Sequence, residues 1–582
     1  MRRELLVAAL LVTAQILAVG LISRVQAQDA PGADAAAPAQ DASPDSTEAV
    51  APLPDGAPDA TAEDVAPLGA EQPAPAAPQT PAAGDPATSP EAAPAPVAEA
   101  VPADPVVAVL RAKLSDPAVV KNANPSDVAA LVAFYGARTG APLWVTDMGF
   151  TARAQSALFE IEKGEDWGLT ASAFALPPAG ALPRSADEQA KAEIDLDLAI
   201  LKYARHARGG RFNPLEVSRL YDQSPPIRDP AVVVAEISTS STPDAYLRSL
   251  HPKHEQFDRL RQALLKARGN SEGEGVKPAG SEKDVKRILV NMERWRWMPE
   301  NLGHVYVLNN SPEFMLYVVK DGKRIYADKT LVGTSAYATP VFTADLKTIV
   351  FNPDWVAPPT VVRENLLPAL SAGKYSVLKV HGLSVSLNGK AVDPSRVSWN
   401  RSNILGYTFS QRGGPTNVLG KAKFLYPNRH TVYMHDTLPV RKKYFQKSQR
   451  MIGHECVRME KPDKFAGVLL AEDQGLSEGK LKELWDKGLN SPVSIRSKIP
   501  VHMVYFTAVV DDDGKVAAFG DVYGLDRKLA SVMFGNAAGF TEPPPDTTVP
   551  DTEEASASPA PARRATASSN DIVDSLGGFA GD

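Results

Sequence analysis

The sequence predicts an α+β protein in which a helical domain precedes a β-rich domain, with disordered segments at both ends. Three observations support this prediction. Apolar residues at helical spacing occupy the first part of the folded region. Alternating apolar residues separated by hairpin turns dominate the second part. The two flanking segments consist almost entirely of small, polar and proline residues, which cannot bury enough apolar surface to form a core.

The N-terminus has the pattern of an export signal. Arg2 and Arg3 precede an apolar run at 5–22, and Val25-Gln26-Ala27 has the small residues of a cleavage site. We expect residues 1–27 to be a signal peptide. The apolar run also approaches the length that spans a bilayer, so the same segment can instead stay uncut as a signal anchor. In both cases the chain leaves the cytoplasm.

Composition sets the other boundaries. Residues 28–104 form an Ala/Pro-rich linker and residues 541–582 a tail, and we expect both to be disordered because their ordering entropy has no compensating core. A Gly-rich linker at 269–281 separates a helical domain at 105–268 from a β-rich domain at 282–525. A net charge of −7 gives no support for nucleic-acid binding.

The helical domain contains no cluster that suggests chemistry. The segments 125–135 and 187–208 have apolar residues at helical spacing. No thiol or acid cluster accompanies His206, His251 or His254 in the sequence. We therefore predict that these histidines pack in the fold or lie on its surface, and that they bind no metal.

A helix at 281–299 opens the β-rich domain. Its Arg-Trp alternation at 293–297 is compatible with base stacking, but Ile288, Met292 and Met298 join Trp295 in one helical stripe. This stripe predicts a packed helix and no nucleic-acid surface. The rest of the domain is predicted as strands at 304–308, 314–319, 324–332, 502–510 and 516–522, with a short helix at 360–370 and a loop-rich segment at 382–424 between them.

The strongest chemical signal is the single cysteine, Cys456, within Gly453-His454-Glu455-Cys456-Val457-Arg458. Exported proteins that use cysteine for stability carry it in pairs, so this thiol is predicted to be a nucleophile. A thiol attacks carbonyls as thiolate and needs a base, for which His435 and His454 are the candidates. An extended backbone would place His454, Cys456 and Arg458 on one side. Arg458 is then either a clamp for a substrate carboxylate or half of a structural ion pair.

Two alternatives for the cysteine remain open at this point. A zinc site could form from His435, His454 and Cys456, although zinc sites usually present clearer ligand pairs. Cys456 could also be buried and inert, since free cysteine is among the most buried residue types.

The region around Cys456 resembles the L,D-transpeptidase (YkuD-type) catalytic domain. The motif of that family is a histidine, a spacer, and then Ser/Thr-His-Gly-Cys followed closely by Arg or Asn. Here residues 436–452 separate His435 from Gly453, which is compatible with the motif. Further segments resemble the large, scaffold-bearing (YcbB-like) Gram-negative members. These segments are Arg287 to Trp297, Asn352 to Trp355, Gly414 to Gly420, Tyr426 to Arg429, Pro142 to Trp144 and Gly209 to Pro214.

The resemblance implies roles for the residues of the motif. Cys456 would be the nucleophile and His435 its general base, with the backbone carbonyl of Asp436 orienting the imidazole. Backbone N–H groups at Glu455 and Cys456 would hold the oxyanion with help from the Tyr433 hydroxyl. His454 would support the loop.

The resemblance also implies a reaction. The thiolate would attack a peptidoglycan stem at the bond between its third-position diamino acid and fourth-position D-alanine. D-alanine would leave, and an amine of a second stem would resolve the thioester into a 3-3 crosslink. No metal and no cofactor are implied, the compartment would be the periplasm, and protein partners are unknown. An insertion at about 357–424 would be the lid over the site.

Two departures from the family pattern stand out. Glu455 replaces the glycine before the nucleophile, and a carboxylate close to the thiol would raise its pKa. The short 269–281 linker leaves no room for the peptidoglycan-binding insert that large members often carry. Besides the transpeptidase, two hypotheses therefore stay open. One is a catalytically weak cell-wall binding or scaffolding protein, and the other is a hydrolase or D-amino-acid exchange enzyme that uses the same acyl-enzyme.

Overall fold

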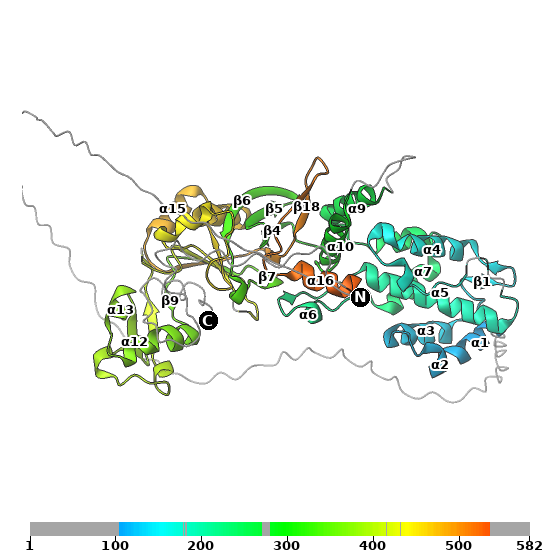
Figure 1. Cartoon of the computed structure of the whole chain (residues 1–582), viewed down its shortest axis with the longest axis horizontal. Helices are drawn as coiled ribbons and strands as arrows, with labels where there is room; N and C mark the ends of the chain where they lie inside the picture. The colour runs from blue at the N-terminus through cyan, green and yellow to red at the C-terminus, as the bar shows by residue number, and fades with distance from the viewer. Residues whose placement is uncertain are drawn as a thin grey trace, which may run out of the picture. The chain divides into compact units, whose positions relative to one another are not determined.

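The computed structural model describes residues 104–178, 180, 183–269, 280–414, 416–430 and 432–535, apart from the side chain of Thr360. The predicted signal segment 1–27, nearly all of the linker 28–104, residues 270–279 and the predicted tail 541–582 lie outside this part. Over the described residues no helix is both long and apolar enough to cross a membrane. The α+β class is confirmed, because helices precede a β-rich domain built on a large sheet (Figure 1).

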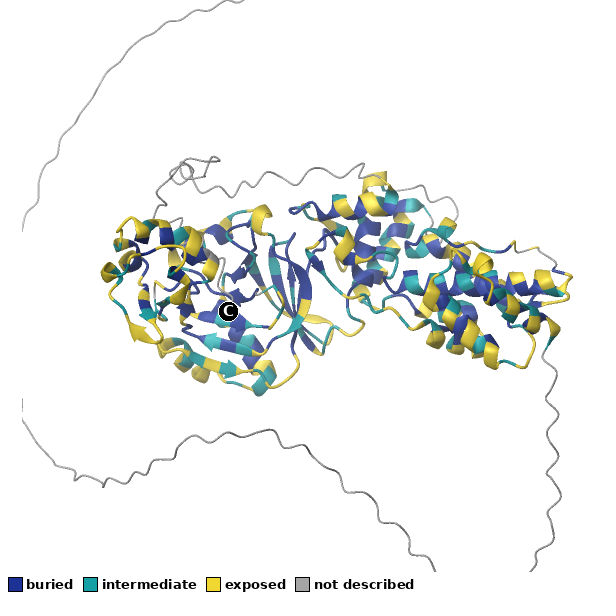
Figure 2. Ribbon diagram, turned by 90° about the horizontal axis from the view of Figure 1, so that it is seen from below, coloured by how far each residue is buried: buried dark blue, intermediate teal, exposed yellow. Residues whose placement is uncertain are grey.

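Residues 104–269 fold mainly as helices. Several begin with a proline behind an Asp or Asn whose side chain accepts a hydrogen bond from the first turn, as Asp104, Asn124 and Asp229 do. Buried residues line the sides where these helices pack together (Figure 2). The helices are α1 (Pro105–Leu114), α2 (Pro117–Val120), α3 (Pro125–Ala137), α4 (Ala152–Glu162), α5 (Ala186–Ala207), α6 (Pro214–Val217), α7 (Pro230–Thr239), α8 (Pro243–Ser249) and α9 (Glu255–Arg268), with short strands β1 (Val145–Thr146), β2 (Gly149–Phe150) and β3 (Tyr221–Asp222).

A buried polar cluster fixes the centre of this region. The Tyr135 hydroxyl lies 2.7 Å from carboxyl oxygens of both Glu193 and Asp197, one turn apart on α5. Glu193 also accepts hydrogen bonds from the backbone N–H groups of Trp144 and Val145. One phenol proton cannot serve two carboxylates, so one carboxyl group of the pair must carry a proton of its own. Burial correspondingly raises the pKa of Glu193 to about 7 and raises that of Asp197.

Of the histidines of the helical region, His206 and His251 are buried in the core and His254 is partly buried. The His251 ring stacks on Trp167 with centroids 4.2 Å apart, and its Nε2 lies 2.8 Å from the Tyr203 hydroxyl. Burial lowers the pKa of His251, and it lowers the pKa of His206 to about 3. These rings therefore stay neutral at physiological pH.

Helix α10 (Glu282–Arg296) follows the linker. Ser281 caps it through a capping box with Asp284. The predicted stripe of Ile288, Met292, Trp295 and Met298 is buried, which confirms that the Arg-Trp alternation belongs to a packed helix. The helix ends at Arg296, slightly before the predicted end at Pro299.

The β-rich domain is built on a sheet in which strands far apart in sequence are neighbours. Among the described residues its order is β16-β8-β13-β14-β15-β6-β5-β4-β17-β7-β3. Most neighbours pair antiparallel, whereas β14 and β15 run parallel. The bounds are β4 (Val305–Asn310), β5 (Met315–Lys320), β6 (Lys323–Leu331), β7 (Val341–Asp345), β8 (Thr348–Phe351), β13 (Ala422–Leu425), β14 (Met434–His435), β15 (Val457–Met459), β16 (Ser491–Ser494) and β17 (Pro500–Val504).

The predicted strand 502–510 is in fact two strands. After β17 the chain bends at residues 505–507, where the Thr507 backbone N–H donates to the Asn291 side chain of α10. A separate hairpin then forms from β18 (Ala508–Val510) and β19 (Val516–Ala518) around the predicted turn. Helices α14 (Pro462–Gln474), α15 (Glu478–Asp486) and α16 (Leu525–Phe534) complete the domain, so described structure continues beyond residue 525.

The insertion at 357–424 is more regular than predicted. The predicted helix at 360–370 is present as α11 (Pro359–Val361), a π-helical turn at Val362–Leu366 and α12 (Leu367–Ser371), followed by α13 (Ser376–Val380). The segment predicted as loop-rich instead supplies strands β10 (Ser384–Leu387), β11 (Lys390–Ala391) and β12 (Thr408–Gln411), which form a small sheet with β9 (Trp355–Val356). Figure 1 shows α12, α13 and β9 grouped together.

Candidate active site

Three adjacent strands of the large sheet bring the predicted site residues together. His435 of β14 pairs with Lys423 of β13 on one side and with Arg458 of β15 on the other. Residues directly opposite each other in a ladder share a face of the sheet. The register therefore places Lys423, His435 and Arg458 in one row across the sheet.

Cys456 directly precedes β15 and lies beside Tyr433, which precedes β14. The Val457 N–H donates to the Tyr433 carbonyl at 3.2 Å, so the segments that lead into β14 and β15 are already paired at this point. Cys456 is 2% exposed. His435, one position beyond Met434 on β14, is 0% exposed. The nucleophile and its candidate base thus come from neighbouring parallel strands in the core of the domain.

The environment of the sulfur favours the neutral thiol. Burial is the main cause, and it raises the pKa of Cys456 to about 11. A hydrogen bond from the Tyr433 backbone and the positive charges of Arg458 and Lys423 act in the opposite direction, while Glu455 raises the pKa further. A base must therefore take the proton when the thiol reacts.

Asp436 is held in place by the strand end on which it lies. Its N–H donates to the Ala422 carbonyl at 2.9 Å. Its carboxylate accepts from the Lys421 N–H and pairs with Lys442 at 2.7 Å. Gly420, with φ +62°, allows this approach, since a Cβ there would lie 2.5 Å from the Asp436 carboxyl carbon. These contacts fix the position of Asp436, the residue whose backbone carbonyl is predicted to orient the imidazole.

His454, Cys456 and Arg458 were expected on one side if the backbone near Cys456 is extended, and this condition is not met. Strand β15 begins only at Val457, and Gly453 bends the chain with φ +85°. The His454 ring packs against Tyr337 with centroids 3.9 Å apart. Burial and the nearby Arg458 lower the pKa of His454 to about 3. A ring so weakly basic suits packing in the loop better than proton transfer.

Arg458 lies beneath the loop that carries the nucleophile. It is 3% exposed, and its Nη1 donates to the Ile452 carbonyl at 2.9 Å. A Cβ on Gly453 would lie 2.5 Å from that nitrogen, so glycine is needed for the close approach. In the described part of the chain no carboxylate forms a salt bridge with Arg458. The contact that the structure gives this side chain is therefore with loop backbone, and the substrate clamp stays a prediction.

Glu455 is half-buried beside the nucleophile. Burial raises the pKa of its carboxyl group, while His430 lowers it. Its backbone carbonyl accepts a hydrogen bond from the Thr339 hydroxyl at 2.8 Å. The glutamate that departs from the family motif thus stands in a well-defined backbone position.

Two residues near the sulfur, Lys423 and Tyr426, were not singled out as site residues from the sequence, whereas Tyr433 was. The Lys423 Nζ lies 4.0 Å from the centre of the Tyr433 ring. The buried hydroxyls of Tyr426 and Tyr433 have no hydrogen-bond partner within the described residues. Burial and the nearby Cys456 raise the pKa of both phenols. Lys423 lies near the site because β13 pairs with β14 and places Lys423 opposite His435. The sequence alone does not reveal this pairing.

The described His, Cys, Asp and Glu side chains form no group of three or more that could hold a metal ion. Within that part of the chain, the zinc alternative for His435, His454 and Cys456 has no ligand set.

Comparison with protein families identifies the domain that contains these residues. Residues 304–495 match the model of the L,D-transpeptidase catalytic domain, and residues 129–264 match a model described as a scaffold domain. Residues 304–495 are thus similar to the L,D-transpeptidase catalytic domain. Cys456, His435 and the rest of the row across the sheet all lie within this segment. The helical region before it is similar to the scaffold domain.

Comparison with individual proteins agrees with this assignment. A Haemophilus influenzae protein, provisionally named as an L,D-transpeptidase, is 31% identical over 255 residues. The match covers 43% of this chain and 50% of the relative, so the chain spans about half the length of the relative that it matches. A crystal structure of an L,D-transpeptidase from Stackebrandtia nassauensis is 12% identical and covers 63% of this chain and 97% of its own. Its TM-score is 0.15.

Proposed function

We propose that the chain is a peptidoglycan L,D-transpeptidase that forms 3-3 crosslinks through a cysteinyl thioester. The observation that supports this most directly is the position of Cys456 in a segment similar to the L,D-transpeptidase catalytic domain, beside the strand that carries His435. A buried thiol and a buried imidazole on paired segments of the sheet form an arrangement suited to acyl transfer.

The first half-reaction would cleave the donor stem. His435 takes the proton of Cys456, and the sulfur attacks the carbonyl carbon of the third-position diamino acid. The backbone N–H groups of Glu455 and Cys456, assisted by the Tyr433 hydroxyl, stabilise the oxyanion that forms. The C–N bond to D-alanine then breaks, the leaving nitrogen takes the proton from the imidazole, and a thioester remains on Cys456.

The second half-reaction would transfer the acyl group. A neutral amine of a second stem attacks the thioester carbonyl, its surplus proton passes to His435, and the sulfur leaves as thiolate. The energy of the cleaved peptide bond is kept in the thioester, so water must stay out until the acceptor arrives. The insertion at 357–424, with its own helices and small sheet, is the candidate lid for this purpose.

The proposed location follows from the substrate. Peptidoglycan stems are reached in the periplasm, and the export signal predicted at residues 1–27 would deliver the chain there, either free or held at the inner membrane.

Incubation of the purified chain with a defined tetrapeptide-containing muropeptide tests the proposal. We expect mass spectrometry to show release of D-alanine, a transient acyl adduct on Cys456 and a 3-3 crosslinked dimer. Cys456→Ala should abolish all three. Exposure to a carbapenem should add one acyl mass to the wild-type chain and none to Cys456→Ala.

The same experiment separates the remaining hypotheses. A tripeptide product without dimer indicates a hydrolase, and incorporation of an added D-amino acid indicates an exchange enzyme. If neither muropeptide nor carbapenem acylates Cys456, the catalytic proposal is wrong and a binding role in the cell wall is favoured.

A further inference from the structure

A loop at residues 333–339 packs against the nucleophile loop, residues 453–456. The Thr334 N–H donates to the Gly453 carbonyl at 3.1 Å, and the Tyr337 ring packs on His454. A Cβ on Gly333 would lie 1.9 Å from the Tyr337 carbonyl oxygen and 3.0 Å from that of His454. The two loops are therefore in close contact at positions that tolerate no added atoms.

Thr339 forms the contact nearest the nucleophile. It is 0% exposed, and its hydroxyl both donates to the Glu455 carbonyl at 2.8 Å and accepts from the Gly333 N–H at 3.0 Å. One donor and one acceptor bond fix the direction of the hydroxyl proton. This proton points at the carbonyl of the residue before Cys456.

That carbonyl belongs to the same peptide group as the Cys456 N–H. In a planar, trans peptide the C=O and N–H point in opposite directions, so holding one fixes the other. Within the described residues neither the Glu455 N–H nor the Cys456 N–H donates a hydrogen bond. Both are the donors that the proposed function assigns to the oxyanion.

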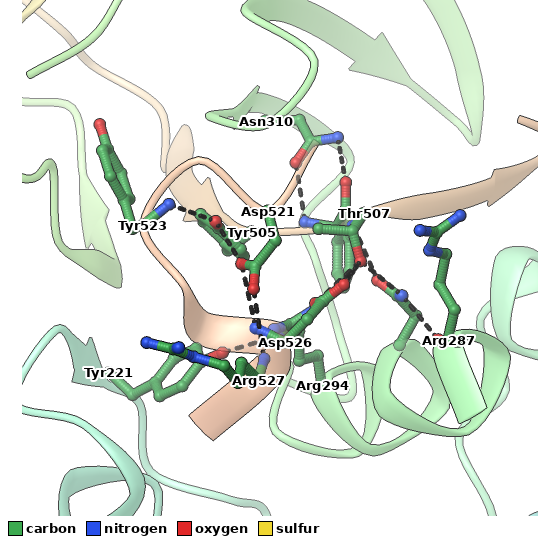
Figure 3. Close-up of polar contacts among 12 residues, drawn as sticks. Tyr221, Arg287, Arg294, Asn310, Tyr505, Thr507, Asp521, Tyr523, Asp526 and Arg527 are labelled. Atoms are coloured by element: carbon green, nitrogen blue, oxygen red, sulfur yellow. Dashed lines mark hydrogen bonds and ion pairs between the residues drawn. The ribbon is translucent and has the colours of Figure 1, made fainter. Parts of the chain in front are cut away.

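Tyr523 supports Thr339 from behind. Its hydroxyl donates to the Gly333 carbonyl at 2.8 Å and accepts from the Thr339 N–H at 3.4 Å. The Tyr523 N–H in turn donates to the Tyr505 hydroxyl, which donates to Asp521, both at 2.8 Å (Figure 3). Asp521 also accepts from the backbone N–H groups of Asp526 and Arg527 at the start of α16. A chain of hydrogen bonds thus runs from a helix start to the nucleophile loop.

We propose that Thr339, held by Tyr523, is a positioning residue that fixes the 455–456 peptide so that the Cys456 N–H is aimed at the oxyanion. This inference rests on the proposed function. Thr339 touches neither the sulfur nor the imidazole in the contacts described above. Its effect is therefore on steps in which negative charge develops on a carbonyl oxygen.

Two reactions of the same thiol separate this role from a general structural one. Acylation by a carbapenem forms an oxyanion, whereas alkylation by iodoacetamide does not. We expect Thr339→Val to slow acylation of the full chain by about 10- to 100-fold and to change alkylation by less than about threefold. Thr339→Ser keeps the hydroxyl and should restore acylation to within about fivefold of wild type.

Tyr523→Phe should slow acylation by about 3- to 10-fold, because Thr339 loses its support but keeps its hydroxyl. This variant also provides a test if Thr339→Val does not fold. Thr343→Val is the matched control, since the Thr343 hydroxyl contacts His502 on β17 and lies outside both loops. It should acylate at the wild-type rate.

The outcomes are distinguishable. If the wild-type chain is acylated and Thr339→Val is acylated equally fast, the positioning role is wrong while the proposed function stands. The role is equally wrong if acylation and alkylation fall together, because Thr339 then only maintains the fold or access to the thiol. If the wild-type chain is never acylated, the proposed function itself fails.

Discussion

Cys456 is the residue whose surroundings most strongly shape its chemistry. Its raised pKa, about 11, leaves about one molecule in ten thousand as thiolate at pH 7. Under the proposed function, reactivity at neutral pH comes from proton transfer to His435 with a substrate in place. In the resting protein the thiol should behave as an ordinary buried group.

This behaviour predicts a characteristic pH profile for alkylation. Because only the thiolate reacts, the rate of iodoacetamide labelling of the substrate-free chain should rise about tenfold per pH unit from pH 7 towards 10. The rise should level off near pH 11. Intact-mass kinetics at several pH values measure this profile. A plateau already at pH 7 to 8 would show a thiolate that is stabilised in the resting state.

Glu455 contributes a smaller part of the raised pKa of Cys456. Its negative charge raises the pKa of Cys456, so Glu455→Gln should lower that pKa and speed alkylation at pH 8 by about two- to fivefold. Glu455→Gly, which recreates the family motif, should have at least this effect. Glu460→Gln removes a carboxylate just beyond β15 and serves as the control. Unchanged labelling in both Glu455 variants would show that this carboxylate does not act on the sulfur.

At the level of elements, the helices were predictable because each signal was local. Apolar spacing located α3, α5 and α10 to within a few residues. The segment at 382–424 was predicted as loop-rich because β10 and β12 are four residues long and β11 two, with turns between them. Strands this short gain their stability from pairing partners elsewhere in the chain, which a single sequence does not reveal.

The residues of the candidate site also divide into those with a local sequence signal and those that depend on distant contacts. Cys456, His435 and Asp436 were found from a motif whose residues lie close in sequence. Lys423 and Thr339 were missed because only strand register and loop packing bring them near the sulfur. The shared side expected for His454 depended on an extended backbone, and β15 begins only at Val457.

Helix α5 supplies a prediction about stability. Burial raises the pKa of Glu193 to about 7, above about 4.3 in an unfolded chain, so the folded state favours the protonated carboxyl. Its contribution to the free energy of unfolding is complete below about pH 4.3 and is lost as the pH rises through 7, by about 4 kcal/mol. Glu193→Gln cannot titrate and should remove this part of the pH dependence.

Thermal unfolding of the full chain between pH 4.5 and 8, followed by tryptophan fluorescence, measures the effect. Asp195→Asn is the matched control, because Asp195 lies on the outer side of α5 and pairs with Lys191. It should keep the wild-type slope. A Glu193→Gln variant with that same slope would contradict the prediction.

At the scale of the whole molecule, a buried cluster around one ion pair of the β-rich domain also contacts the helical region. Arg294 and Asp526 lie 2.5 Å apart with both side chains 2% exposed. The Arg294 Nε also donates to the Tyr221 hydroxyl of β3, and Thr507 donates to Asp526 (Figure 3). Tyr221 precedes the linker and Asp526 belongs to α16, so this cluster connects three separate parts of the sequence.

Breaking the pair should destabilise the chain strongly. Arg294→Met leaves Asp526 buried without its cation and is expected to cost about 3–5 kcal/mol of unfolding free energy. Arg259→Met is the control, since Arg259 joins α9 to the exposed Asp512 near the surface and should cost less than about 1 kcal/mol. Chemical denaturation compares the two.

The double variant Arg294→Met with Asp526→Leu completes the cycle. Removing both charges should recover at least about half of the loss, because the penalty comes mainly from the charge left alone. No recovery would mean that Arg294 acts mainly through its contact with Tyr221.

Burial of the sulfur has a further consequence for its oxidation. Peroxide converts thiolates to sulfenic acid and then to irreversible sulfinic and sulfonic acids, and susceptibility follows thiolate character and exposure. A sulfur that is 2% exposed and protonated at rest is a poor target for such damage. Burial and the raised pKa should therefore slow oxidative inactivation of this thiol. The sequence contains no second cysteine that could form a disulfide with an oxidised Cys456.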